Sequence, residues 1–150
     1  MKSKDRRKGA SVMRKADCIF CKIANGEIPS KTLYEDEDFR VILDASPATK
    51  GHSLILPKEH YANLYEIDEE VAAKAMKLAK KLAVHMKETL HCDGVNILQN
   101  NEETAGQTVF HFHMHVVPRY KDARNDDILQ WTHEEFSEEE IKEILKTIQM

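Results

Sequence analysis

The chain has 150 residues, of which 41% are hydrophobic and 32% charged, and its formal net charge is −4. This length fits one domain that folds without disulfides, and the composition excludes disordered, collagen-like and low-complexity proteins. The negative charge argues against nucleic acid as a partner, and no apolar run approaches the roughly 20 residues that cross a bilayer. Eight histidines, three of them within five residues, stand out.

The N-terminal residues 1–16 are basic and differ in composition from the rest of the chain. No apolar run follows them, so they predict a disordered arm rather than a secretory signal, and the domain is expected over 17–150. Cys18 and Cys21 form a C-x-x-C pair, with Cys92 far away. Three cysteines cannot all pair, which favours a reducing cytoplasm with thiols or metal ligands.

Hydrophobic periodicity and turn residues predict the elements in chain order. They are a helical turn within 17–26, strands over 31–35, 39–43 and 52–56, a helix over 68–91, strands over 95–99 and 108–117, and a last helix after Ser137. Asp68 offers an N-cap for the long helix, and Ser137 with Glu140 forms a capping box. This order predicts an α+β fold with an antiparallel sheet.

The long helix carries an apolar stripe at helical spacing. Its members are Val71, Ala75, Leu78, Leu82 and Met86. Lysines occupy the outer face, so the stripe is expected to pack in the core rather than to form a groove for a partner.

The segment 109–117 alternates histidine with apolar residues. In a strand, His111, His113 and His115 would share one face, about 6.5–7 Å apart. The opposite face would carry the apolar residues Phe110, Phe112, Met114 and Val116, expected to pack on a helix. A slip of one residue would bury all three imidazoles, so the register is expected to be fixed.

A row of three imidazoles has three interpretations. It is a solvated polar face, a metal site, or a nucleophile that attacks phosphorus while a neighbouring histidine binds the phosphate. Gly106 leaves room for a ligand, and Gln107, Thr108 and Asn100 are neutral donors suited to phosphate oxygens. The strand contains no carboxylate to serve as the general base of a metallohydrolase.

At these residues the chain resembles the histidine triad (HIT) family, whose signature is H-x-H-x-H followed by apolar residues. The motif stands here as His111-Phe-His113-Met-His115-Val-Val after Gly106-Gln-Thr, and the likeness extends upstream through 17–37, 41–60 and 94–100. It covers roughly 17–121 and leaves 122–150 as a C-terminal helical extension. The resemblance implies a five-stranded HIT-like fold and a hydrolase or transferase acting at the α-phosphate of a nucleotide through a nucleotidyl-histidine intermediate.

The resemblance also implies roles for single residues. His113 matches the nucleophile, His115 the residue that bonds a non-bridging phosphate oxygen, and His52 the histidine that orients the ring of the nucleophile. Asp44 matches the acidic residue that takes the ribose hydroxyls, a sensible partner for a bidentate carboxylate. The remaining matches are Asn100, Gln107 and Thr108 for the phosphate, and Phe20, Ile23 and Ile28 for an apolar base pocket. Taken alone, Asp44 is an ordinary turn residue and His52 an ordinary strand histidine.

A C-x-x-C pair alone fits zinc, redox or buried-thiol chemistry. Some HIT relatives, and the distantly related galactose-phosphate uridylyltransferases, carry zinc on two such cysteines and two histidines. The resemblance thus implies a structural zinc on Cys18, Cys21, His60 and His111, which leaves His113 free to attack.

The sequence leaves the substrate open. The leading expectation is a hydrolase of nucleoside phosphoramidates or related conjugates; the alternatives are a dinucleoside polyphosphate hydrolase, a non-catalytic nucleotide sensor or scaffold, and a catalytic metal on the three histidines. The stretch around Arg119 departs from the phosphoramidase branch and is similar to bacterial general HIT proteins, and Arg119 either contacts a polyphosphate or merely solvates the surface. Family habit implies a purine nucleotide and a homodimer, with the helix over 68–91 suited to the interface.

Overall fold

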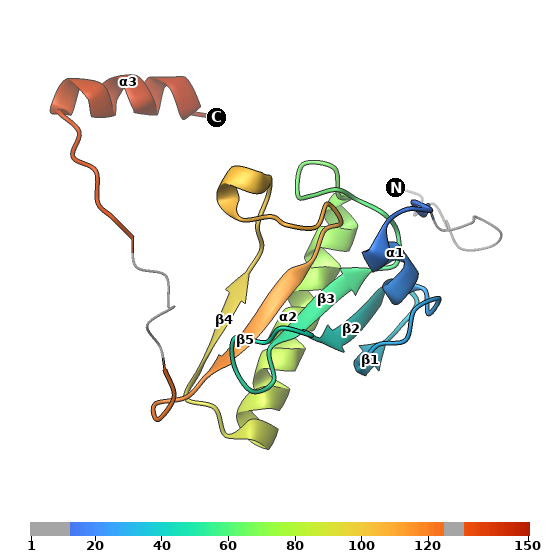
Figure 1. Cartoon of the computed structure of the whole chain (residues 1–150). Coiled ribbons are helices and arrows are strands. Elements are labelled where there is room, and N and C mark those ends of the chain that lie inside the picture. Colours follow the sequence, from blue (N-terminus) through green and yellow to red (C-terminus); the bar gives the residue numbers. More distant parts are fainter. Residues whose placement is uncertain (1–12, 125–130) are drawn as a thin grey trace, which may run out of the picture.

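The computed structural model describes residues 13–124 and 131–150 (Figure 1). Most of the expected N-terminal arm, and positions 125–130 of the C-terminal extension, lie outside the described residues. Within the described part, the Met13 carbonyl accepts a hydrogen bond from the His60 N–H at 2.7 Å. Residue 13 is therefore tied to the segment that follows the third strand.

Five strands and three α-helices make up the described part of the chain. In chain order they are α1 (Ile19–Ala24), β1 (Thr32–Glu35), β2 (Phe39–Leu43), β3 (Ser53–Pro57), α2 (Glu69–Leu90), β4 (Gly94–Leu98), the 3₁₀ turn η1 (Glu103–Ala105), β5 (Met114–Arg119) and α3 (Glu138–Ile148). Asp68 caps α2 by accepting the Glu70 N–H, and Ser137 with Glu140 forms the expected capping box of α3.

The strands form one antiparallel sheet in the order β1-β2-β3-β5-β4. Strand β5 lies inside the sheet, between β3 and β4, where Leu54 of β3 and Leu98 of β4 both pair with His115. The expected α+β class with a five-stranded antiparallel sheet is confirmed. A central position gives β5 neighbours on both sides and makes it a rigid support for the residues it carries.

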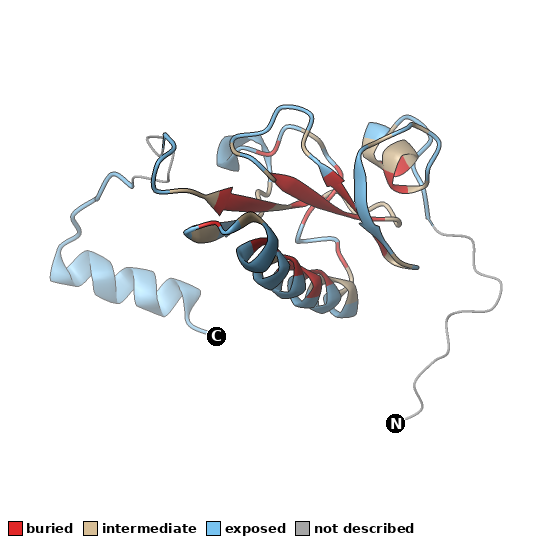
Figure 2. Ribbon diagram, turned by 90° about the horizontal axis from the view of Figure 1, so that it is seen from below, coloured by how far each residue is buried: buried red, intermediate tan, exposed pale blue. Residues whose placement is uncertain are grey.

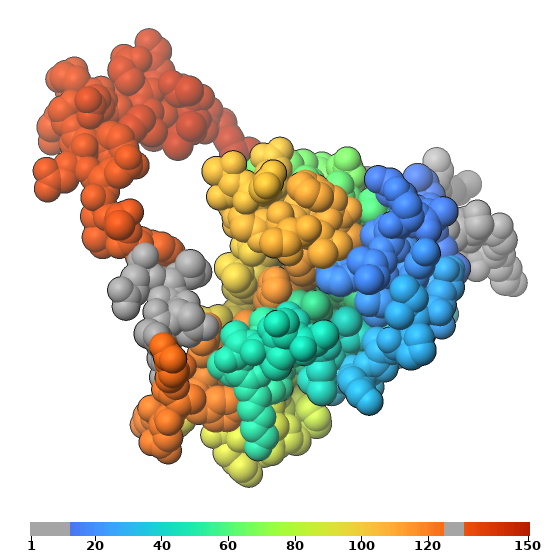
Figure 3. Space-filling model, in the orientation of Figure 1, coloured from blue at the N-terminus to red at the C-terminus, as the bar shows by residue number. Residues whose placement is uncertain are grey.

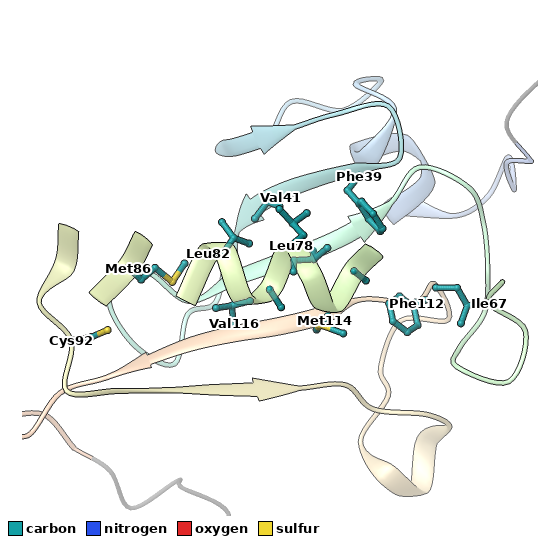
Figure 4. Packing of buried hydrophobic residues seen from close by; sticks show 13 residues of the cluster. Phe39, Val41, Ile67, Leu78, Leu82, Met86, Cys92, Phe112, Met114 and Val116 are labelled. Carbon is teal, nitrogen blue, oxygen red and sulfur yellow. The ribbon is translucent and has the colours of Figure 1, made fainter. Parts of the chain in front are cut away.

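Helix α2 covers one face of the sheet, where the main core lies (Figures 2 and 4). Leu78, Leu82 and Met86 are buried there against Phe39, Val41 and other residues of the sheet. This stripe is therefore core, as expected. The expectation that the helix contributes to a dimer interface stays a prediction.

The other face of the sheet holds a smaller cluster under α1. Ala24 of α1 packs on Ile42 of β2 and on Leu54 and Leu56 of β3. Along β2 and β3 successive side chains alternate between the two faces, so one short strand pair supports both clusters. Helix α1 thus lies on the face opposite α2 (Figure 2).

The histidine row is not one strand, and this part of the prediction is wrong. Strand β5 begins at Met114, so His111 and His113 lie in the segment before it. The Phe112 N–H donates to the Tyr61 carbonyl instead of to a strand. Phe112 is buried in the core as expected, whereas Phe110 is 51% exposed and does not pack there.

Strand β5 also runs beyond its expected end. Pro118 pairs with Val95 of β4, while the pairing with β3 has already ended at Val116. A proline without an N–H is tolerated where a neighbouring strand stops.

Helix α3 lies outside the core. None of its residues is buried, including the apolar Ile141, Ile144, Leu145 and Ile148. No helix among the described residues is long and apolar enough to cross a membrane.

Candidate active site and metal centre

Segments distant in sequence meet on the face of the sheet that carries α1. They are the α1 segment, the turn between β2 and β3, and the loop that leads into β5, coloured blue, teal and yellow to orange in Figure 3. These segments carry the candidate residues Phe20, Asp44, His52, Asn100 and His113. The fold therefore gathers on one surface residues that the sequence keeps far apart.

Two cysteines and two histidines form a compact cluster. Their ligand atoms lie within 4.8 Å of one another. The Cys18 and Cys21 sulfurs are 3.5 and 3.4 Å from His111 Nδ1, and the Cys21 sulfur is 3.3 Å from His60 Nδ1. The four residues that the resemblance named for zinc are therefore close together.

These separations fit tetrahedral zinc. Bonds of about 2.3 Å to sulfur and about 2.05 Å to nitrogen, at tetrahedral angles, separate the two ligand atoms by about 3.6 Å. The three sulfur–nitrogen distances of 3.3–3.5 Å lie close to that value. The Nε2 of His111 lies 2.9 Å from the Pro57 carbonyl. It donates its proton there and leaves Nδ1 with a lone pair for a metal, a usual outer partner of a ligating histidine.

Burial sets the protonation of this cluster. It lowers the pKa of His111 to about 4 and also lowers the pKa of His60, so both rings are neutral at pH 7. Burial raises the pKa of the Cys21 thiol. A bound cation would compensate for this by stabilising the thiolate.

His113 is buried, at 7% exposure, and its orientation is fixed by the main chain. Its Nδ1 lies 2.7 Å from the carbonyl of His111, so Nδ1 carries the proton and donates it. Nε2 therefore holds a lone pair, the state that a nucleophilic imidazole requires. The ring of Phe20 packs edge-on against it at 5.1 Å between centroids, and burial lowers the pKa of His113.

His115 and His52 form a second pair beside His113. His52 Nε2 lies 2.9 Å from His115 Nδ1 and 3.5 Å from Asp44 Oδ2. Burial lowers the pKa of His52 and, together with neighbouring histidines, lowers that of His115 to about 4. His52 thus contacts His115, while the His111 carbonyl orients the ring of His113, which corrects the role expected for His52.

The loop before β5 differs from the expectation at Gln107. This side chain is buried, its amide group donates to the carbonyls of Ala62 and Val109, and its oxygen accepts the Glu102 N–H. Both amide protons are therefore used, and none is left for a phosphate. Thr108 is exposed.

Asn100 lies beside Gly106. A Cβ on that glycine, whose φ is +96°, would come within 3.4 Å of the Asn100 amide nitrogen. Glycine therefore suits both the backbone conformation and the space at this position.

The expected base pocket is brought together in part. Phe20 and Ile23 of α1 pack against the cluster under that helix. Ile28 is half-buried and is not part of that cluster. The structure also adds main-chain groups that sequence reasoning does not identify: the Pro57 and His111 carbonyls and the Ala48 N–H, which donates to His52 Nδ1 at 2.9 Å.

Comparisons with known proteins agree with this geometry. The sequence profile of the HIT domain family matches residues 25–122. The adenosine 5′-monophosphoramidase of Saccharomyces cerevisiae is 43% identical over 120 residues, covering 80% of this chain and 73% of the yeast protein.

Two solved structures are also similar. A Streptococcus mutans protein superposes with a TM-score of 0.84 at 43% identity, covering 94% of this chain and 90% of that one. A zinc-bound histidine triad family protein from Mycobacterium smegmatis has a TM-score of 0.68 at 41% identity, covering 84% of this chain and 88% of that one.

Proposed function

Because this chain belongs to the HIT family, we propose that it hydrolyses nucleotide conjugates at the α-phosphate through a nucleotidyl intermediate on His113. The observation that carries the proposal is the main-chain hydrogen bond at Nδ1, which leaves Nε2 of this buried ring unprotonated. An imidazole that is already held in one tautomer and one orientation loses little conformational entropy when it attacks.

In the first step Nε2 of His113 attacks the α-phosphorus. The bond from phosphorus to the leaving group breaks, and the leaving group departs with the electron pair and takes up a proton from solvent. In the second step water attacks the same phosphorus and releases a proton to solvent, the N–P bond breaks, and a nucleoside monophosphate leaves while His113 recovers its lone pair. His115 would bond a non-bridging oxygen, where negative charge builds up in both steps.

The nucleotide is expected to bind across the same face. Asp44 would accept the two ribose hydroxyls, and Phe20 and Ile23 would contact a purine base. Asn100 and Thr108 would donate to the phosphate, whereas Gln107 would support their loop from within. An exposed Thr108 and a half-buried Asn100 are accessible to a ligand.

A nucleoside phosphoramidate is the favoured substrate. The name of the yeast relative, an adenosine 5′-monophosphoramidase, supports this class. The second candidate is a dinucleoside polyphosphate, and Arg119, half-buried at the end of β5, is the residue that would interact with a longer phosphate chain. Turnover of an adenosine phosphoramidate and of a dinucleoside tetraphosphate, compared at equal concentration, decides between them.

We further propose that the Cys18, Cys21, His60 and His111 cluster holds a structural zinc. The ion would supply no step of the reaction; it would join α1 to the segment that carries the nucleophile. The zinc-bound mycobacterial relative supports this assignment.

A homodimer in the cytoplasm is also proposed. The apolar stripe of α2 packs in the core of its own chain. We therefore propose that the outer edge of β4, where Ile97 is 38% exposed, pairs with a second copy. None of the three cysteines forms a disulfide, which fits a reducing compartment. Sedimentation equilibrium of the full chain tests the dimer.

The substitution His113→Asn tests the nucleophile. We expect turnover to fall by about 10⁴-fold or more, with nucleoside monophosphate binding retained. His85→Asn, at an exposed histidine of α2, is the matched control and should keep full activity. Normal turnover by His113→Asn would refute the assignment. A wild-type protein that binds nucleotide but gives no labelled adduct on His113 would instead favour a sensor or scaffold.

A further inference from the structure

The proton position on His115 decides what this residue offers a phosphate. A neutral imidazole carries one proton, on Nδ1 or on Nε2, and the partner of the other nitrogen selects between them. The Nδ1 of His115 faces His52 at 2.9 Å, so Nε2 is the nitrogen left for a substrate. It donates to a phosphate oxygen only if it holds the proton.

A main-chain group fixes the proton of His52. The backbone N–H of Ala48 donates to His52 Nδ1 at 2.9 Å. That nitrogen must present a lone pair, so the proton of the neutral ring lies on Nε2. The Nε2–H then donates to His115 Nδ1, which in turn places the proton of His115 on Nε2.

The opposite direction of the hydrogen bond is excluded chemically. If His115 donated from Nδ1 to His52 Nε2, both nitrogens of His52 would lack a proton, and the ring would be an imidazolate anion. A doubly protonated His52 would aim an N–H at the Ala48 N–H. Asp44 Oδ2 is a competing acceptor for the His52 proton, but at 3.5 Å it lies too far for an ordinary hydrogen bond.

We propose that the backbone N–H of Ala48 is a positioning group that acts through His52 to hold His115 with its proton on Nε2. This inference rests on the proposed function for the statement that His115 faces a phosphate. His115 then serves as a neutral donor, while His113, held by the His111 carbonyl, has its proton on Nδ1 and its lone pair on Nε2. Adjacent histidines of one motif therefore present opposite hydrogen-bonding groups to the same substrate.

The turn that carries Ala48 is fixed from β5 and α2. The Thr49 hydroxyl donates to the Pro118 carbonyl at 2.6 Å, and the Tyr120 hydroxyl donates to the Lys50 carbonyl at 2.7 Å. Gly51 has φ of +92°, and a Cβ there would lie 2.6 Å from Leu90. These contacts hold the Ala48 amide at the position from which it reaches His52.

The tautomer of His52 also determines whether the group of Asp44, His52 and His115 can bind a metal as the cysteine cluster can. Asp44, His52 and His115 also gather their ligand atoms within 4.8 Å. Their geometry alone resembles a site for a divalent cation, but His52 offers no free lone pair, because the lone pair of Nδ1 accepts the Ala48 N–H and Nε2 carries the proton. We therefore expect zinc to bind at the cysteine cluster and not here.

Imidazole ¹⁵N NMR of the wild-type chain, without substrate at pH 7.5, tests the inference directly. The protonated and bare nitrogens of each ring are distinguished by their shifts, and His52→Gln and His115→Gln assign the signals. We expect the proton of His52 and of His115 on Nε2, and that of His113 on Nδ1. A proton on Nδ1 of His115 would overturn the proposal, even if the enzyme is fully active.

Ala48→Pro removes the N–H, and Ala48→Gly keeps it as the matched control. We expect Ala48→Pro to shift His115 toward a mixture of tautomers and to lower kcat by about 10- to 100-fold with a smaller change in KM, since one hydrogen bond to a charged group is lost in the transition state. Ala48→Gly should retain both the tautomer and kcat. A folded Ala48→Pro protein with wild-type tautomers and kcat would refute the role of the amide; if it does not fold, the wild-type spectrum decides. Expected tautomers together with an active His113→Asn variant would instead defeat the proposed function alone.

Discussion

If the proposed zinc is bound, replacing Cys21 by serine is expected to remove it together with much of the stability that it confers. Cys21 is 2% exposed, so Cys21→Ser buries a hydroxyl at a cost of about 1–3 kcal/mol. A ligand present at a thousand times its dissociation constant contributes about 4 kcal/mol more. The free energy of unfolding should therefore fall by about 5–7 kcal/mol in total.

Cys92 provides a matched control for this substitution. It is likewise 2% exposed, but it lies in the core under α2 and outside the metal cluster. Cys92→Ser should cost only the hydroxyl term of about 1–3 kcal/mol and keep its zinc. The difference between the two variants isolates the metal from the general effect of a polar atom in the core.

Urea unfolding with and without a chelator, together with metal analysis of the purified protein, measures these quantities. The chelator should lower the stability of the wild type and of Cys92→Ser by the same amount and leave Cys21→Ser unchanged. The wild type decides the question even if Cys21→Ser does not fold. The assignment would be refuted by a wild-type protein that contains no zinc at neutral pH and whose urea unfolding midpoint is the same with and without the chelator.

Three further outcomes follow from the geometry. Burial lowers the pKa of His115 to about 4 from 6.5; between those values the unfolded chain binds a proton that the folded chain does not, so His115 makes stability fall as pH drops through this window. An NMR titration giving His115 a pKa near 6.5 would contradict this. Asp44→Ala should raise KM about 10- to 100-fold for a ribonucleotide by losing charge-assisted hydrogen bonds, and should abolish discrimination against a 2′,3′-dideoxy substrate in steady-state assays; retained discrimination would rule out the ribose contact. Gln107→Leu should lower the free energy of unfolding by about 1–3 kcal/mol, because the buried amide of Gln107 no longer donates to the Ala62 and Val109 carbonyls or accepts the Glu102 N–H. Thr108→Val, at an exposed position, is its control in the same denaturation assay, and equal stabilities would argue against a structural role for Gln107.

Local sequence patterns predicted the helices and strands whose residues show hydrophobic periodicity, turn residues or helix caps. Strand β2 begins and ends at the expected residues, and α2 differs from its expected range by one residue at each end. Strand β5 was misplaced because alternation of apolar and polar residues marks an extended chain, whether or not a neighbouring strand pairs with it. Around His111 and His113 the chain lies outside the sheet and is held instead by the Tyr61 carbonyl and by ring-to-backbone hydrogen bonds.

The site was predictable where chemistry resides in side chains. The resemblance named Cys18, Cys21, His60 and His111, whose ligand atoms the structure brings within 4.8 Å of one another. The residue type does not determine where a side chain points. Gln107 was therefore expected to face a phosphate, although its amide donates to the Ala62 and Val109 carbonyls.

Every residue carries a main-chain amide and carbonyl, which give no sequence signal at all. The Ala48 N–H and the Pro57 and His111 carbonyls select the tautomers of the neighbouring histidines. These groups could be found only from the folded chain.

The carbonyl of His111 has an evolutionary consequence. It belongs to the residue whose ring faces the cysteines, and it also orients the ring of His113. A change that rotates this one peptide alters both sites at once, so substitutions around the cysteines and substitutions around His113 should be epistatic rather than additive. Natural variants of the two regions are therefore expected to be inherited as compatible pairs.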